Sequence, residues 1–277
     1  MKEALCRTAT LSDVSMMLDW AAKEGWNPGL DDADAFYAAD PEGFFIAEVR
    51  DIPVAAISVV NHSETYAFLG LYLCLPEFRG QGIGFGLWNH ALNHAGDRTV
   101  GLDGVPAQEA NYAKSGFNLA SRTRRWTGHL NIENIGFTLA GPNDFTELER
   151  LDRAATGIYR DRFVKNWVEN GPTRKTIVVK DGSKITGFAT ARLCREGCKI
   201  GPIVAANAGD ALRLACEAAA AIEETYVTID IPDDAAPFAD ALKQNGFSQN
   251  FSTARMFRGK APVAGKGLQA VASLELG

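Results

Sequence analysis

A glycine-rich loop between a predicted strand and a predicted helix constrains this chain more than any other feature. The loop, residues 79–84, reads Arg-Gly-Gln-Gly-Ile-Gly. The apolar run ahead of it predicts a buried strand that Pro76 ends, because proline has no N–H for a strand ladder. A helical pattern follows and stops at Gly96. The apolar residues are Ala67, Phe68, Leu69, Leu71, Leu73 and Leu75 in the strand, and Phe85, Leu87, Trp88, Ala91 and Leu92 in the helix.

Glycines at alternate positions ahead of a helix suit the binding of a large anion. Gly80, Gly82 and Gly84 let successive backbone N–H groups turn inward and let an anion approach the main chain. The helix N-terminus adds about half a positive charge at the same place. The loop matches neither the Rossmann fingerprint nor the P-loop, which ends in Gly-Lys-Ser/Thr. It predicts a pyrophosphate site of another kind; the alternative is an ordinary glycine-rich turn between a strand and a helix.

Residues 74–84 resemble the acyl-CoA loop of the GNAT N-acetyltransferase superfamily. That motif runs V-x-P-x-x-R-G-x-G-I-G, and this chain departs from it only in having Cys74 in place of valine. The resemblance implies an α/β fold with a mixed, mostly antiparallel central sheet flanked by helices. It also implies acetyl-CoA (coenzyme A) as co-substrate, and no metal. The implied cofactor contacts are Leu73, Cys74, Leu75, Arg79, Gly80, Gln81, Gly82, Ile83 and Gly84.

Residues 111–117, Asn-Tyr-Ala-Lys-Ser-Gly-Phe, resemble the superfamily's Tyr-x-Lys-x-Gly-Phe element. Tyr112 holds the position of the general acid that protonates the leaving sulfur; the alternative is a tyrosine that packs at the end of a helix. The superfamily usually has an asparagine seven residues before this tyrosine, where this chain has Val105. Asn111 is the candidate to replace that cofactor contact.

The implied reaction also needs a base, because the acceptor ammonium must lose a proton before it attacks. Asp103 is the candidate, since it ends the strand beside the cofactor strand; the alternative is that it caps the next turn. Glu48 is a weaker candidate. Three histidines are expected on the surface without partners. They are His62, His90 and His94.

Direct attack of the amine on the thioester needs no covalent enzyme intermediate. Cys74 is therefore expected to fill the valine site of the motif rather than to act as a nucleophile. Backbone N–H groups near Leu73 to Leu75 are expected to hold the oxyanion, which is typically worth about 3 to 4 kcal/mol of barrier.

The acceptor is expected near residues 24–30, a loop rich in turn formers that nevertheless holds a large aromatic residue. In the superfamily the loop between the first two helices covers the acceptor site. The resemblance therefore implies substrate contacts from Trp26, Asn27 and Asp31; the alternative for Trp26 is a plug at the edge of the core. The carboxylates of Asp31, Asp32 and Asp34 suit a cationic small molecule, and equally a solvated acidic helix.

Composition and charge argue against several other classes of function. The 277 residues carry a net charge of −6 and no basic run of five or more, which disfavours nucleic acid and anionic membranes as partners. No uncharged apolar segment approaches the roughly 18 residues of a membrane span, and the N-terminus lacks a signal-peptide core. Five scattered cysteines indicate free thiols in a reducing cytoplasm. Cys194 and Cys198 lack a second ligand pair for a metal site.

The second half of the chain repeats the pattern of the first. Phe117 and Phe247, each in a Gly-Phe pair, are both followed eight residues later by arginine, and Asp103 and Asp230 each end a strand. A repeat of this length indicates a duplicated unit. We predict a catalytic domain in residues 1–130 and a degenerate GNAT-like domain in residues 135–258. Residues 259–277 form a C-terminal tail that is either frayed or an arm exchanged between subunits of a homodimer.

The predicted second domain departs from the first at the loop. Residues 201–210 read Gly-Pro-Ile-Val-Ala-Ala-Asn-Ala-Gly-Asp, without arginine, and Asp210 at the helix start would repel a pyrophosphate. We expect no cofactor there. This half resembles the C-terminal domain of a bacterial tandem-GNAT family. The predicted function is transfer of an acetyl or other acyl group from coenzyme A to a primary amine of a small molecule; the alternative is a non-catalytic acyl-CoA-binding or sensing protein.

Overall fold

The protein, described here by a computed structural model of residues 4–277, forms one continuous twelve-stranded sheet. Residues 1–3, at the start of the first predicted domain, lie outside the described residues. The strand order is β1-β2-β3-β4-β5-β11-β6-β10-β9-β8-β7, and β12 pairs with β9. All pairs are antiparallel except β4 with β5 and β9 with β10. The predicted mixed, mostly antiparallel sheet is confirmed.

The elements of the two halves follow one another along the chain. The strands are β1 (Leu5–Thr8), β2 (Phe44–Val49), β3 (Ile52–Asn61), β4 (Tyr66–Cys74), β5 (Thr99–Gly104), β6 (Asn118–His129), β7 (Arg174–Asp181), β8 (Lys184–Leu193), β9 (Cys198–Val204), β10 (Tyr226–Pro232), β11 (Ser248–Arg258) and β12 (Leu268–Ala270). The helices are α1 (Leu11–Lys23), α2 (Asp32–Ala39), α3 (Ile83–Ala95), α4 (Glu109–Lys114), α5 (Phe145–Thr156), α6 (Asp161–Trp167), α7 (Ala208–Ala221) and α8 (Ala236–Gln244).

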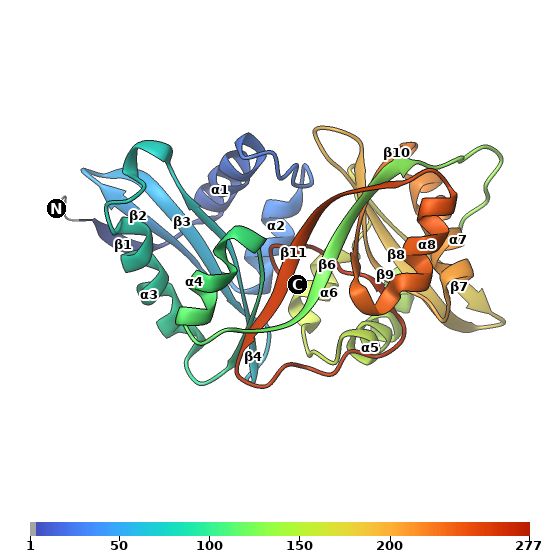
Figure 1. The fold of residues 1–277 in the computed structure, drawn as a ribbon. Helices are drawn as coiled ribbons and strands as arrows, with labels where there is room; N and C mark the ends of the chain where they lie inside the picture. The colour runs from blue at the N-terminus through green and yellow to red at the C-terminus, as the bar shows by residue number, and fades with distance from the viewer. Residues whose placement is uncertain (1–3) are drawn as a thin grey trace.

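The same order of elements occurs twice, side by side (Figure 1). In each half two helices precede a hairpin, a third strand leads into a long helix, and a parallel strand follows. The long helices α3 and α7 each cover a core of their own half. The paired helices share one core, in which Val14 and Phe36 of the first half join Leu148 and Trp167 of the second. The halves are therefore packed together by apolar burial.

The last strands of the two repeats are exchanged between the halves. Strand β6 pairs with β10 of the second half, and β11 returns to pair with β5 of the first, while β6 and β11 pair with each other. Figure 1 shows both strands running across the middle of the molecule. The predicted boundary near residues 130–135 thus separates the two repeats along the chain. In the sheet, however, the last strand of each half comes from the other repeat.

Local sequence signals explain the first elements. Helix α1 begins after Thr10, whose hydroxyl accepts the Asp13 N–H at 3.3 Å while the Asp13 carboxylate accepts the Thr10 N–H at 2.8 Å. This reciprocal capping box satisfies two N–H groups that lack helical partners. The hairpin of β2 and β3 closes through Arg50 and Asp51, both at positive φ. Such a turn matches the twist of the paired strands.

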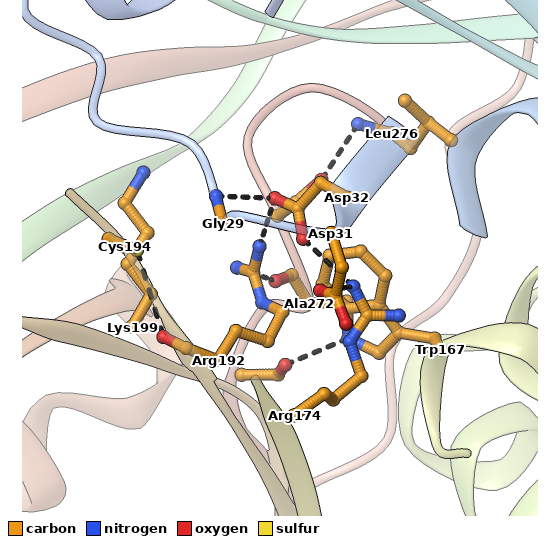
Figure 2. A network of polar contacts seen from close by, with 12 residues as sticks. Gly29, Asp31, Asp32, Trp167, Arg174, Arg192, Cys194, Lys199, Ala272 and Leu276 are labelled. Carbon is orange, nitrogen blue, oxygen red and sulfur yellow. Dashed lines mark hydrogen bonds and ion pairs between the residues drawn. The ribbon is translucent and has the colours of Figure 1, made fainter. Parts of the chain in front are cut away.

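A buried polar network joins the two halves around Asp32 on α2 (Figure 2). Its Oδ1 accepts a hydrogen bond from Arg174 Nη2 at 2.9 Å, and its Oδ2 pairs with Arg192 Nη1. Both guanidinium groups lie over the Trp167 ring, at 4.6 and 4.1 Å from its centroid. Burial raises the pKa of Asp32, but the charges of Arg192 and Arg174 lower it by more, so the pKa lies below its usual value. Asp31 also pairs with Arg174.

The expectation of a solvated or substrate-binding acidic face on α2 is therefore wrong for Asp32, which is buried, and Asp31 shares its carboxylate with Arg174. Asp31 and Asp32 bind arginine of the second half, and Asp34 alone is exposed. These partners were not predictable from the sequence, because Arg174 and Arg192 lie more than 140 residues further along the chain.

The C-terminal segment, residues 259–277, is not a frayed tail, which corrects the sequence expectation. Its β12 pairs with β9, and Val271 N–H donates to the Asp230 carbonyl at 3.0 Å. Ala270 and Leu276 have no exposed surface. The segment then crosses to β4, where the Glu275 carbonyl packs on Gly70. Its small apolar side chains fill the space between the halves, a burial that composition alone did not predict.

Replacing Gly70 by alanine is expected to detach the C-terminal segment from β4. The added Cβ would lie 2.0 Å from the Glu275 carbonyl oxygen. Overpacking a buried site typically costs about 1–3 kcal/mol, so we expect that loss in the free energy of unfolding and faster amide exchange in residues 268–277. Gly86→Ala is the control, because its Cβ would meet no described atom within 4 Å. Unchanged exchange in Gly70→Ala would contradict the contact.

Candidate active site

A wedge opens between β4 and β5 where their pairing ends. The two strands pair in parallel from Tyr66 with Thr99 to Leu69 with Leu102. Beyond that point β4 continues along β3 to Cys74, and β5 continues along β11 to Gly104. The wedge belongs to a cleft of about 990 Å³ that is also lined by the glycine loop, Trp26, and residues of β6 and β11. Backbone groups of β4 are thereby left unpaired at the cleft.

A β-bulge in β4 lies at the mouth of this wedge. Ala56 pairs with Leu73 but Ser58 pairs with Gly70, so two residues of β4 oppose one of β3. Leu71 in the bulge has a φ of +46°, which non-glycine residues rarely adopt. Strain of this kind clusters at functional sites.

The backbone N–H groups of β4 differ in availability. Leu75 N–H donates to the Val54 carbonyl of β3 at 2.9 Å, so it cannot serve as the oxyanion donor that the sequence placed near Leu73 to Leu75. Because successive N–H groups of a strand point to opposite edges, the Cys74 N–H points to the wedge. Leu73 and Cys74 line the cleft, and Leu75 lies outside its lining.

The glycine loop forms an open cradle at the start of α3. Gly80 and Gly82 have φ of +74° and +82°, and Gly82 is the N-cap, so no side chain occupies the N-terminal N–H groups of the helix. A Cβ on Gly84 would lie 2.7 Å from the Tyr72 hydroxyl. The three glycines line the cleft. This arrangement fits a pyrophosphate, because free N–H groups and the helix dipole meet there.

Arg79 braces the loop and lies half-exposed at its edge. Its Nε donates to the Cys74 carbonyl at 2.8 Å, and its Nη2 pairs with Glu24 at 2.6 Å. Two other predicted contacts point elsewhere: Gln81 donates to the Glu77 carbonyl at 2.8 Å, and Ile83 is buried in the core under α3. Neither lines the cleft.

Two tyrosines face the cleft beside Trp88. Tyr112 stacks on the Trp88 ring with centroids 5.7 Å apart, and Tyr72 meets the same ring edge-on at 5.3 Å. Burial raises the pKa of Tyr112, and burial with the nearby Cys74 and Tyr112 raises the pKa of Tyr72 to about 12. Both hydroxyls therefore keep their protons at neutral pH. The sequence analysis identified Tyr112 but not Tyr72. The signal that could have identified Tyr72 is its position between Leu71 and Leu73, in the strand that precedes the glycine loop.

Asp103 lines the cleft, yet its carboxylate already has partners. Thr253 Oγ1 donates to its Oδ1 at 3.0 Å, and Arg255 pairs with its Oδ2. Burial raises the pKa of Asp103. The second half contains the same pair, since Arg125 makes two 2.8 Å hydrogen bonds with Asp230. A pair present in both halves points to a role in the sheet, and the role of Asp103 as base stays a prediction.

The predicted acceptor contacts divide between the cleft and the junction of the halves. Trp26 lines the cleft. Asn27 donates to the Glu196 carbonyl at 2.7 Å, and Asp31 pairs with Arg174, so both join the halves instead. Asn111, the predicted substitute cofactor contact, is exposed and donates to Gln108 at 2.7 Å. It does not line the cleft, whereas Gln108 does.

The other titratable candidates lie away from the reacting end of the cleft. Glu48 pairs with Arg7. The expectation of partnerless surface histidines is wrong for two of the three: His62 is bonded to the Leu276 carbonyl at 2.9 Å, and His94 pairs with Asp40 at 2.8 Å, whereas His90 is exposed. Burial lowers the pKa of His62 to about 4.

Cys74 lines the cleft. Burial raises the pKa of its thiol, which disfavours the thiolate that a nucleophile needs.

Metal sites and membrane spans were searched in residues 4–277. No group of three or more His, Cys, Asp or Glu side chains in this range is placed to hold a metal ion. No helix in the same range is long and apolar enough to cross a membrane.

The corresponding wedge of the second half is filled by the chain itself. Strands β9 and β10 pair only at Cys198 and Lys199, and β12 then lies beside β9 while Val271 bonds to β10. At the start of α7 the Asn207 side chain accepts the Asp210 N–H at 3.0 Å and donates to the Asp210 carboxylate. The helix N-terminus is thus already capped by Asn207, and the Asp210 carboxylate adds a negative charge there.

Comparisons with known proteins agree with this geometry. A family model described as Acetyltransferase (GNAT) family matches residues 12–117, and one described as Acetyltransferase (GNAT) domain matches residues 148–268. A protein named holothin acyltransferase, from Pseudoalteromonas sp. (strain SANK 73390), is 37% identical over 281 residues, which cover 98% of this chain and 94% of that protein.

Two solved structures show the same fold. A putative acetyltransferase from Pyrococcus horikoshii has a TM-score of 0.82 at 20% identity and covers 100% of this chain and 97% of its own. A tandem GNAT protein from the clavulanic acid biosynthesis pathway has a TM-score of 0.62 at 17% identity. The match covers 94% of this chain and 100% of that protein's chain. Both structures resemble this chain in fold, including the arrangement of its two halves.

Proposed function

Because this chain belongs to the GNAT family of acyltransferases, as a tandem GNAT protein, we propose that it transfers an acetyl or other acyl group from coenzyme A to a primary amine of a small molecule. The observation that carries the proposal is the open wedge between β4 and β5, which leads to the glycine cradle at α3. Its counterpart in the second half is filled, so we propose one acyl-CoA site per chain.

Acyl-CoA, when bound, supplies the thioester that the acceptor attacks. Gly80, Gly82 and the first turn of α3 would hold its pyrophosphate through backbone N–H groups. The Cys74 N–H, at the open edge of β4, would donate to the oxyanion, and such a preorganised donor is typically worth about 3–4 kcal/mol. The Tyr112 hydroxyl, protonated at neutral pH, would give its proton to the leaving sulfur.

Holothin is the first acceptor to test. The relative named holothin acyltransferase matches nearly the whole of both chains. Two aromatic side chains of this protein, Trp26 and Phe251, line the cleft and would offer apolar contact to such an acceptor. The small molecule would enter between the first half and strand β11 of the second repeat.

The test is calorimetric titration with acetyl-CoA, followed by a thiol-release assay with holothin and a panel of small amines. We expect binding at one site per chain and thiol release with at least one amine. Binding without release on any amine would favour the non-catalytic acyl-CoA-binding or sensing protein. No binding would overturn the assignment of the glycine cradle.

Replacing Arg79 by alanine is expected to weaken acetyl-CoA binding about tenfold, measured by calorimetry. The guanidinium braces the loop through the Cys74 carbonyl and adds positive charge beside the cradle, and a charge-assisted hydrogen bond is worth about 1.5–3 kcal/mol before solvent screening. Arg162→Ala removes the same charge from the exposed surface of α6 and should not change affinity. Equal affinity of Arg79→Ala and the unaltered protein would count against the cradle.

A further inference from the structure

The C-terminal segment carries a carboxylate into the cleft of the first half. Glu275 lines this cleft beside Leu71 and Tyr72, yet it belongs to the second repeat's end of the chain. The residue is only 7% exposed. Within residues 4–277 its carboxylate accepts no hydrogen bond and makes no ion pair. A glutamate this buried whose carboxylate has no hydrogen-bond or ion-pair partner is unusual, because buried polar groups normally have such partners.

The backbone around Glu275 is fixed from both sides. Before it, the Ala272 carbonyl accepts a hydrogen bond from Arg192 at 3.2 Å. After it, Leu276 N–H donates to Ser273 Oγ at 3.0 Å, and the Leu276 carbonyl is bonded to His62. The Glu275 carbonyl itself packs on Gly70, the residue before the strained Leu71 of the bulge. Glu275 is thus held beside the part of β4 whose backbone faces the wedge.

The charged groups around Glu275 are engaged with other partners. Arg125 of β6, Arg192 of β8 and Lys199 of β9 all interact with it electrostatically, and Asp230 of β10 shares the same surroundings. Arg125 is bound by Asp230 through two hydrogen bonds, Arg192 by Asp32, and Lys199 Nζ donates to the Trp26 carbonyl at 2.8 Å. Because these cations are bound to other groups, the Glu275 carboxylate oxygens stay free to contact a ligand.

We propose that Glu275 is the general base that takes the proton from the acceptor amine. The inference rests on the proposed function. A Glu275 carboxylate oxygen takes one proton from the acceptor ammonium, and the neutral nitrogen then forms the new bond to the acyl carbon. As the C–S bond breaks, the sulfur takes the Tyr112 proton, and the second proton of the nitrogen passes to the Tyr112 phenolate, which leaves a neutral amide. Glu275 suits this step better than Asp103, because both Asp103 oxygens are occupied by Arg255 and Thr253.

The test compares Glu275→Gln with the unaltered protein on a series of acceptor amines that differ in pKa. Loss of a positioned base typically lowers kcat/KM by about 10²- to 10⁴-fold, and we expect this for amines protonated at the assay pH. For amines already neutral at that pH the loss should be much smaller. The ratio of the kcat/KM values for two amines, measured on one preparation, does not depend on the fraction of folded protein. The ratio therefore separates the role of a base from a structural role.

Three further variants sharpen the result. Glu275→Asp keeps a carboxylate and should recover part of the activity on protonated amines. Glu169→Gln removes an exposed glutamate of the second half and should match the unaltered protein. Asp103→Asn tests the competing base. An amine-dependent loss in Asp103→Asn but not in Glu275→Gln would overturn the proposal, as would an equal loss on all amines in Glu275→Gln.

Failure of the proposed function would look different from failure of this inference. If the unaltered protein binds no acetyl-CoA and acylates no amine, the acyltransferase assignment itself fails. If it turns over and Glu275→Gln turns over equally well on every amine, only the role of Glu275 is lost. Acetyl-CoA affinity measured by calorimetry should be the same in Glu275→Gln and the unaltered protein, because the cradle lies at α3.

Discussion

Tyr112→Phe is expected to lower kcat by about 10²- to 10⁴-fold, the usual range for loss of a positioned proton donor. The substitution removes only the hydroxyl and keeps the ring that stacks on Trp88 at 5.7 Å. Acetyl-CoA affinity should therefore change little, because the cradle and the wedge are intact. A thiol-release assay with the best acceptor measures kcat, and calorimetry measures the affinity.

Two other tyrosines complete this experiment. Tyr159→Phe alters a tyrosine that is 48% exposed and lies outside the cleft lining, so kcat should be unchanged. Tyr72→Phe tests the second hydroxyl of the cleft, which lies near Cys74 and Tyr112. A large loss in Tyr72→Phe with normal turnover in Tyr112→Phe would show that the proton comes from Tyr72.

Asp32→Asn is expected to lower the free energy of unfolding by about 3–5 kcal/mol, the usual result of removing one partner of a buried ion pair. The substitution keeps the shape of the side chain but leaves Arg192 and Arg174, both almost fully buried, without the charge that offsets their burial. Asp31 still pairs with Arg174 in this variant, so the loss of the compensating negative charge falls mainly on Arg192. Chemical denaturation measures the effect.

Asp34→Asn is the matched control, because Asp34 is an exposed carboxylate in the same first turn of α2 and should change stability by less than about 0.5 kcal/mol. The pH dependence gives a second check. The folded-state pKa of Asp32 is below its usual value, so its stabilisation is fully present above about pH 4 and is lost as pH falls through the folded pKa. A stability difference that did not shrink in acid would contradict the ion-pair explanation.

Sequence alone predicted the glycine loop of the proposed cofactor site because its chemistry is local. The proline, the arginine and the alternate glycines of residues 76–84 are contiguous, and the cradle needs only that run of backbone and the helix that follows. Tyr112 was predicted in the same way, through a short element whose spacing fixes its position, and it lines the cleft. The duplication was visible for the same reason, since both copies keep their turns and strand ends at matching intervals.

The proposed acceptor end was not predictable in this way, because its residues meet only through long-range pairing. Exchange of β6 and β11 brings Phe251 to the first half, and the C-terminal segment brings Glu275 to the bulge of β4. Asp103 looked like a free carboxylate because its partner Arg255 lies 152 residues away. The fold class, the repeat and the proposed anion cradle were predictable from the sequence, because they depend on local pattern. Tertiary structure decided which strands pair and which carboxylate is left unpartnered, because both depend on contacts between distant residues.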